Sequence, residues 1–248
     1  MRAGAWRGST AGAAPGFAQA NLVVVEGEWA DDFRLFCARN TQACPLLDVT
    51  IAGSPQPRRV APDADIRTDV PGYRIYEGDQ FRSAHDLKGV WRADLVAFLL
   101  GCSFTFERAL VERGIAMRHV ELSRVVPMFV TSTMCAPAGR LHGPLVVSMR
   151  PIPTARVDEV RRICGSFPGA HGAPVHAGDP TVIGIADLAR PDFGDPVPVR
   201  AGETPVFWAC GVTPQVVLRQ SGCSWYATHE PGHMFVTDRP EDMVALGG

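Results

Sequence analysis

The chain has 248 residues, of which 46% are hydrophobic and 20% are charged, and its net charge at pH 7 is −2. This composition is typical of a packed globular protein and offers no basic footprint for nucleic acid. No apolar run approaches the roughly 18 to 20 residues that span a bilayer. The seven cysteines are scattered and form no C-x-x-C pair, which argues against a zinc ribbon and a disulfide framework. We expect a protein of the reducing cytoplasm with no cofactor, metal, nucleic acid or membrane as partner.

The spacing of apolar residues predicts short strands and helices in the first half of the chain. Prolines between residues 44 and 71 indicate irregular backbone. In the helix predicted at 91–100, Leu95, Phe98 and Leu99 face inward, and Gly101 ends it. In chain order, the predicted elements are a strand at 21–25, a helix at 28–39, a strand at 73–76 and helices at 91–100 and 103–113.

The second half repeats a strand that is followed by a turn and a helix. The repeated pairs are a strand at 143–149 with a helix at 154–164, and a strand at 205–210 with a helix that begins at Thr213. Strands that alternate with helices predict an α/β fold. We expect a mixed or mostly parallel sheet flanked by helices, with a smaller associated α+β lobe, and a last strand at 233–237. Residues 1–248 would form one α/β unit of two lobes, whose boundary the sequence does not define.

Two junctions expose backbone donors that suit a small anion. A strand meets a capped helix at 210–215, and one predicted helix ends where another begins at 101–103. Free N–H groups and the helix dipole attract negative charge at such places. A helix N-terminus also lowers the pKa of a thiol, here Cys102; the alternatives are an ordinary turn and a small buried cysteine. The candidate substrate-binding residues of the two junctions are Cys102, Ser103, Cys210, Gly211, Thr213 and Gln215.

Arginines and histidines supply the remaining candidates. The planar fork of Arg140 or Arg150 suits a carboxylate, although a single arginine more often forms a structural ion pair. Histidine is the natural general acid or base near neutral pH. Residues 171–179 hold two histidines and an aspartate, which fit catalysis, a metal site or a structural role. Residues 229–233 spell H-E-x-x-H, but their proline and glycine oppose the helix that the zinc motif requires. The candidate catalytic residues are His142, His176, Asp179 and His233.

Several of these stretches resemble the signature segments of the D-glutamate cyclase family, whose bacterial members are labelled hydro-lyases. The resemblance runs in order through almost the whole chain. It implies an α/β fold of two lobes and the conversion of D-glutamate to 5-oxo-D-proline with loss of water. The matching segments are QANL (19–22), CPLLD (44–48), GCSF (101–104), PAGR (137–140), HGP (142–144), SMRP (148–151), HGAPVH (171–176), Gly178-Asp179-Pro180, WACGVTPQ (208–215) and PGHMF (231–235).

Lactam formation would need a clamp for the carboxylate, a folded substrate and a group that moves protons. The hypothesis gives the clamp to Arg140 or Arg150, and proton transfer to His142, His176 or His233 with Asp179 as the orienting residue. The expected partner is a small acidic substrate such as D-glutamate, and the sequence is compatible with a homo-oligomer. Two alternatives remain, namely a lyase or hydrolase for another small acid and a non-catalytic carboxylate-binding protein. A metal held by residues 171–179 would indicate metal-assisted chemistry.

Overall fold

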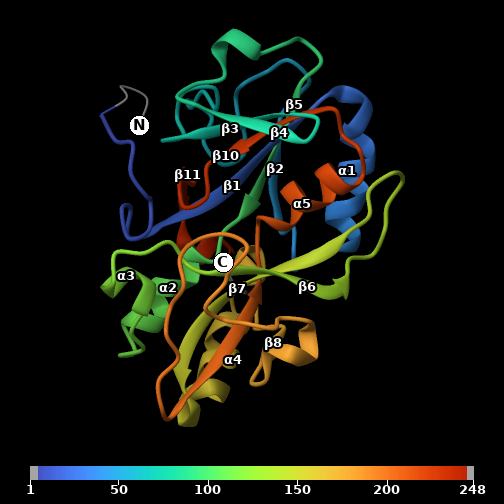
Figure 1. Ribbon diagram of the computed structural model, residues 1–248. Coiled ribbons are helices and arrows are strands. Elements are labelled where there is room, and N and C mark those ends of the chain that lie inside the picture. The colour runs from blue at the N-terminus through green and yellow to red at the C-terminus, as the bar shows by residue number, and fades with distance from the viewer. Residues whose placement is uncertain (1–4, 245–248) are drawn as a thin grey trace.

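The computed structural model describes residues 5–244 and contains two β-sheets (Figure 1). The larger sheet comprises β1 (Phe17–Val25), β2 (Leu46–Val49), β3 (Tyr73–Glu77), β4 (Gln80–Ala84), β5 (Val96–Gly101), β10 (Trp225–His229) and β11 (Phe235–Pro240). The smaller sheet comprises β6 (Met128–Met134), β7 (Pro144–Pro153), β8 (His176–Ala177) and β9 (Glu203–Ala209). The helices are α1 (Gly27–Arg39), α2 (Phe104–Val111), α3 (Arg118–Glu121), α4 (Val157–Gly165) and α5 (Thr213–Gln220). Short 3₁₀ turns are η1 (Lys88–Val90), η2 (Thr154–Arg156), η3 (Pro168–Ala170), η4 (Pro180–Ile183) and η5 (Glu241–Val244).

Both sheets are antiparallel, so the prediction of a mixed or mostly parallel sheet flanked by helices is wrong. The larger sheet runs β2-β5-β1-β10-β3-β4 with β11 beside β1, and the smaller runs β6-β7-β9-β8. Each strand pair within the described residues is antiparallel. A parallel pair needs a crossover that returns the chain to the end where the first strand began. The chain leaves β7 at Pro153 and re-enters β9 opposite it at Glu203, so β9 runs back along β7.

The predicted helix at 91–100 is also wrong, because Val96–Gly101 forms the strand β5. This strand lies between β1 and β2, and all six of its residues are buried. A strand buried on both faces is a continuous apolar run, which residue spacing alone does not distinguish from a buried helix. The elements predicted at 21–25, 28–39, 73–76 and 103–113 are confirmed, with shifts of a few residues at their ends.

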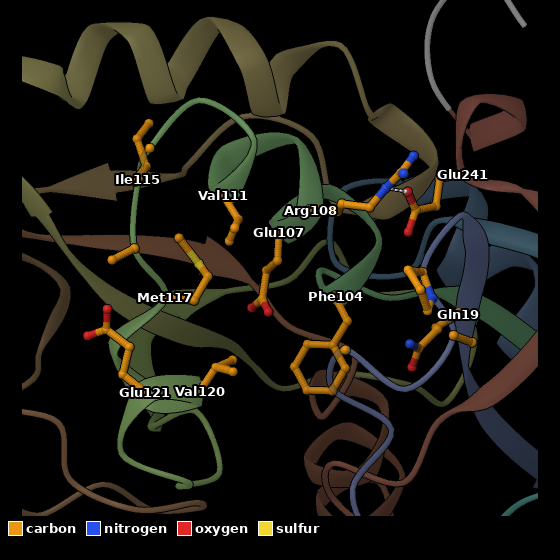
Figure 2. A pocket seen from close by; sticks show the side chains of 15 residues that line it. Gln19, Phe104, Glu107, Arg108, Val111, Ile115, Met117, Val120, Glu121 and Glu241 are labelled. Carbon is orange, nitrogen blue, oxygen red and sulfur yellow. Dashed lines mark hydrogen bonds and ion pairs between the residues drawn. The ribbon is translucent and has the colours of Figure 1, made fainter.

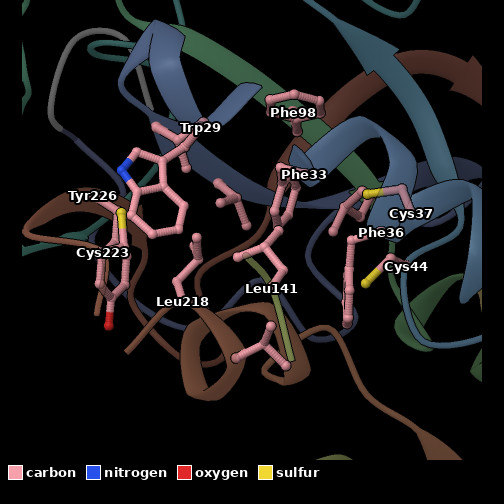
Figure 3. Close-up of a cluster of buried hydrophobic side chains, with 14 of the residues drawn as sticks. Trp29, Phe33, Phe36, Cys37, Cys44, Phe98, Leu141, Leu218, Cys223 and Tyr226 are labelled. Atoms are coloured by element: carbon pink, nitrogen blue, oxygen red, sulfur yellow. The ribbon is translucent and has the colours of Figure 1, made fainter. Parts of the chain in front are cut away.

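One face of the larger sheet packs against α1 and α5 and forms the main aromatic core (Figure 3). The buried residues of α1 recur every three or four positions, so they form one stripe along the helix. Phe33 of this stripe meets Phe98 of β5 edge to face, with ring centroids 4.7 Å apart. The alternate residues of β1, Leu22 among them, enter a second core on the opposite face. Among the described residues, no helix is long and apolar enough to cross a membrane.

The smaller sheet also has two different faces. Arg150, Val206 and Trp208 share one face, where α2 and α4 complete a core. Met149 and Phe207 lie on the other face with residues of a separate cluster. Side chains alternate between the faces of a strand. The pairing of Arg150 with Val206 therefore places Arg150 on the face that α2 covers. This placement determines which sequence segments meet in the site.

Candidate active site

Two turns that follow strands of different sheets meet where the sheets adjoin. The first turn follows β5 at Gly101, and the second follows β9 at Gly211. The amide of Asn21 on β1 donates to the Gly101 carbonyl at 2.8 Å. A Cβ at Gly211 would lie 2.1 Å from Cγ of Asn21, and a Cβ at Gly101 would lie 1.6 Å from the Gly169 carbonyl oxygen. Both turns therefore need glycine, because another part of the chain occupies the place of a side chain.

Arg150 lies beside this junction and is almost completely buried, with 1% of its surface exposed. Its Nε donates to Glu107 Oε1 at 2.9 Å, and its two terminal nitrogens donate to Ser148 Oγ at 3.0 Å and Ser103 Oγ at 2.9 Å. The guanidinium also lies 5.3 Å from the ring centre of Trp208. Three parts of the chain, around α2, β7 and β9, thus surround one charge, and four of the five N–H donors of the guanidinium are used within the protein.

Glu107 is the acidic partner of Arg150, and it stays ionised. Burial raises the pKa of this carboxyl, but the charges and hydrogen bonds of Arg150 and His119 outweigh burial and lower it to about 2. His119 Nε2 lies 3.4 Å from Glu107 Oε1, an ion-pair distance that is long for a hydrogen bond. The imidazole is buried and stacks on Phe104, with ring centroids 6.4 Å apart. One carboxylate oxygen is therefore shared between a guanidinium and an imidazole.

Glu107 also lines a cavity of about 520 Å³, which we call the Glu107 cavity. Figure 2 shows its carboxylate pointing to the middle of the cavity, between Met117 and Phe104. Arg108 stands at one side and donates from Nε to Glu241 Oε2 at 2.7 Å. The walls are mainly apolar, and the principal lining side chains are Gln19, Phe104, Glu107, Arg108, Val111, Ile115, Met117, Val120, Glu121 and Glu241.

The two junction cysteines have raised rather than lowered pKa values. Burial raises the pKa of Cys102 to about 12, and burial raises that of Cys210 to about 11. Of the two interpretations of Cys102, the small buried cysteine fits and the reactive thiol does not, because the side chain is cut off from water and desolvation outweighs the field of the short helix α2. Both residues contribute to packing at the junction, with Cys210 in a small apolar cluster beside Val212.

His171 is buried in the same region but was not a candidate catalytic residue. Its Nδ1 lies 2.8 Å from the Gln42 carbonyl oxygen, and its backbone is left-handed with φ of 73°. Burial lowers its pKa to about 4, so the ring is neutral at pH 7. His171 connects the end of the η3 turn to Gln42 in the loop before β2, which is a structural role.

His176 and Asp179 lie on the opposite face of the smaller sheet from Arg150. His176 is paired with Phe207 in the register, and the two rings lie 5.7 Å apart. Its Nε2 contacts the Asp179 backbone oxygen at 2.7 Å, whereas the Asp179 carboxylate accepts from the backbone and hydroxyl of Thr181. The expected meeting of Arg150 and His176 in a single pocket is therefore absent, because adjacent positions of β7 and β9 project to opposite faces.

The remaining candidates are distributed over other parts of the surface and core. Arg140 is exposed, and its Cζ lies 3.8 Å from the centre of the Trp29 ring. Its Nε donates to Asp32 Oδ2 at 2.9 Å. His142 is exposed, with Nδ1 3.0 Å from the Arg140 carbonyl oxygen. Half-buried His233 contacts the carbonyl oxygens of Pro231 and Arg7, at 2.9 and 3.2 Å.

Thr213 and Gln215, at the start of α5, are buried in protein contacts. Thr213 Oγ1 accepts from the Val146 backbone N–H at 3.1 Å. Gln215 Oε1 accepts from the Tyr76 hydroxyl at 3.2 Å. Arg150, Ser103, Cys102, Cys210 and Gly211 are thus the candidates that the structure brings together.

Sequence reasoning missed Glu107 and His119. Glu107 stands four residues after Ser103, a spacing that places both on one side of a helix, so the predicted helix at 103–113 could have shown it. His119 has no such signal, because it comes from a separate four-residue helix. Among the described residues, no group of three or more His, Cys, Asp and Glu side chains is arranged to hold a metal ion.

Comparison with known proteins places the chain among relatives of nearly equal length. Residues 96–238 match the family model described as D-glutamate cyclase. A protein of Rubrobacter xylanophilus named "Putative hydro-lyase" is 58% identical over 240 residues, which are 96% of this chain and 93% of that protein. A protein of Stutzerimonas stutzeri with the same name is 54% identical over 247 residues, 99% of this chain and 93% of its own. A crystal structure of the nitrogen repressor-like protein MJ0159 from Methanococcus jannaschii aligns over 94% of this chain and 93% of its own at 9% identity, with a TM-score of 0.41.

Proposed function

The chain belongs to the D-glutamate cyclase family, and we propose that it is a hydro-lyase for a small acidic amino acid, with D-glutamate as the first substrate to test. In that reaction the α-nitrogen forms a bond to the γ-carboxyl carbon, one carbon–oxygen bond breaks, and water leaves with 5-oxo-D-proline. The enzyme must hold the amine and the carboxyl end of the same molecule close together, take a proton from the amine and supply one to the leaving oxygen.

The observation that supports this proposal is the ionised Glu107 carboxylate, which faces the cavity while Arg150 and His119 hold its inner oxygen. A carboxylate in this setting binds an ammonium group well. Of the described residues, those in the walls carry three carboxylates, from Glu107, Glu121 and Glu241, but only one guanidinium, that of Arg108. This balance favours a substrate with an amine over a simple dicarboxylate, and Arg108 is placed to bind a substrate carboxylate.

The roles of the other groups follow from their positions. Glu107 is a weak base because its pKa lies near 2, so it binds and orients the amine. His119 is buried and does not line the cavity, so we assign it a role through Glu107, whose carboxylate its Nε2 contacts at 3.4 Å. Arg150 is almost completely buried, does not line the cavity and gives four of its five N–H donors to Glu107, Ser103 and Ser148, and it therefore positions Glu107 rather than clamping the substrate. The apolar walls contact the substrate methylene groups.

The test is a substrate panel on the purified chain, with products identified by mass spectrometry and chiral separation. The panel contains D-glutamate, L-glutamate, D-aspartate and glutarate, which lacks the amine. We expect turnover of D-glutamate to 5-oxo-D-proline and none of glutarate. Glu107→Gln should lower kcat/KM by about 10²–10⁴-fold, whereas Glu159→Gln, at a surface ion pair with Arg156, should not.

The same panel separates the competing functions. Turnover of a different acidic amino acid would identify another lyase substrate for the same cavity. Binding without turnover of any panel member would indicate a carboxylate-binding protein instead. A Glu107→Gln variant with the rate of the unmodified chain would remove the Glu107 cavity as the site of the reaction.

A further inference from the structure

A second cavity, of about 590 Å³, lies along β2 and β11 of the larger sheet. Three exposed arginines line it, Arg58 and Arg59 from the loop after β2 and Arg239 from β11. The other lining residues within 5–244 are Ala18, Leu46, Leu47, Val60 and Thr237, and none of them is acidic. We call this the arginine cavity. Its charge is opposite to that of the Glu107 cavity, and the two therefore suit different groups.

The loop that carries Arg58 and Arg59 is held in place from two sides. On one side, Asp48 Oδ2 accepts from the Arg59 and Val60 backbone N–H groups at 2.7 and 3.2 Å. On the other side, Arg239 Nε donates to the Arg59 carbonyl oxygen at 2.8 Å. Asp48 is only 3% exposed and ends the CPLLD segment. That segment has no part in the Glu107 cavity, and its carboxylate serves to fix the arginine loop.

The guanidinium groups of Arg58 and Arg59 make no hydrogen bond or ion pair with any residue in the described range 5–244. Three guanidinium groups around one hollow repel one another, and a bound anion would lower that repulsion. Guanidinium forks bind carboxylate and phosphate oxygens in pairs. The apolar side chains of Leu46, Leu47 and Val60 in the lining suit a ligand that also has a carbon frame.

We propose that the arginine cavity binds a small organic anion that carries two or more negative charges. This site is separate from the Glu107 cavity and does not depend on the reaction proposed above. The anion contacts Arg58 and Arg59 through its charged oxygens, and its carbon frame lies on the apolar floor. The guanidinium of Arg239 both donates to the Arg59 carbonyl oxygen and lines the cavity.

The test is calorimetric titration of the full chain at low ionic strength with citrate, with inorganic phosphate and with acetate. We expect citrate to bind more tightly than phosphate, and acetate not to bind measurably. The double variant Arg58→Ala/Arg59→Ala should weaken citrate binding at least about tenfold, because two charged partners are lost. Arg82→Ala, an exposed arginine of β4 outside the cavity, should bind citrate within about twofold of the unmodified chain.

Three results would overturn the proposal. One is the absence of citrate binding, and another is an equal loss in the double variant and in Arg82→Ala. The third is phosphate binding as tight as citrate binding, which would show that the apolar floor contributes nothing. The titration needs no turnover, so it is independent of the substrate panel. Glu107→Gln should bind citrate as the unmodified chain does, and a change there would show that the two cavities share one ligand.

Discussion

Among the described residues, Arg150 is the only cation that donates a hydrogen bond to the Glu107 carboxylate. Replacing Arg150 by methionine removes this charge and leaves a side chain of similar volume. The Glu107 carboxylate then stays buried beside one imidazole, and its remaining charge is no longer offset. Removing one partner of a buried ion pair costs about 3–5 kcal/mol. For a chain of this size each kcal/mol lowers the melting temperature by about 2–4 °C, so we expect a loss of about 6–20 °C.

The assays are urea unfolding at pH 7, which gives the free energy of unfolding, and thermal unfolding, which gives the melting temperature, both followed by tryptophan fluorescence. The double variant Glu107→Gln/Arg150→Met should recover most of the loss, because no charge remains in the protein interior. Arg219→Ala is the matched control, since its ion pair with Asp79 is exposed; it should cost less than about 1 kcal/mol. A similar small loss for Arg150→Met, or a double variant no more stable than the single one, would refute the reasoning.

The same pair predicts a dependence on pH. Glu107 has a folded pKa of about 2, below its ordinary value of 4.5. Its contribution to stability is therefore complete above about pH 5 and is lost as the pH falls toward 2. In Arg150→Met the unpaired carboxyl has a higher pKa, so the penalty of the substitution should shrink as the pH falls. A penalty that stays constant from pH 7 to pH 4 would contradict this account.

Three further predictions concern the junction between the sheets. His171 has a folded pKa of about 4, below its ordinary value of 6.5, so the free energy of unfolding should fall as the pH drops from about 6.5 to 4. Asparagine tolerates the φ of 73° at this position. His171→Asn should therefore flatten that part of a profile of urea stability against pH. Gly101→Ala forces a Cβ against the Gly169 carbonyl oxygen and should cost about 1–3 kcal/mol or more in thermal unfolding, whereas Gly89→Ala, with open space around it, should not. The buried cysteines, Cys102 among them, should react with a thiol reagent only after urea is added; rapid labelling of the folded chain would contradict their burial.

The sequence predicted local elements better than their arrangement. The helix at 28–39 could be predicted because one side of α1 is buried and the other is exposed to solvent, which leaves a periodic pattern of apolar residues. Residues 96–101 carry no such pattern, since β5 is buried on both faces. The direction of β9 beside β7 depends on where a long connection returns, and no local pattern of residues records that path.

For the site, residue type identified the arginine but not its role. Arg150 stands in a segment that resembles a family signature, and it does lie among Ser103, Cys102 and Cys210. Sequence could not show that its donors would be used by Ser148, Ser103 and Glu107. The separation of His176 from Arg150 follows from a single step in strand register, which spacing along the chain does not reveal. The catalytic roles assigned to His142, His176, Asp179 and His233 stay predictions.

The contact of Gly101 with Gly169 joins β5 of the larger sheet to the η3 turn, which precedes β8 of the smaller sheet, through main chain alone. Because neither residue contributes a side chain, the separation of the sheets at this seam does not depend on the rotamers around it. The walls of the Glu107 cavity can therefore change size or polarity between relatives without moving the backbone that presents Glu107. Selectivity for a substrate can then evolve in Val111, Ile115 or Val120 while the charged centre keeps its geometry.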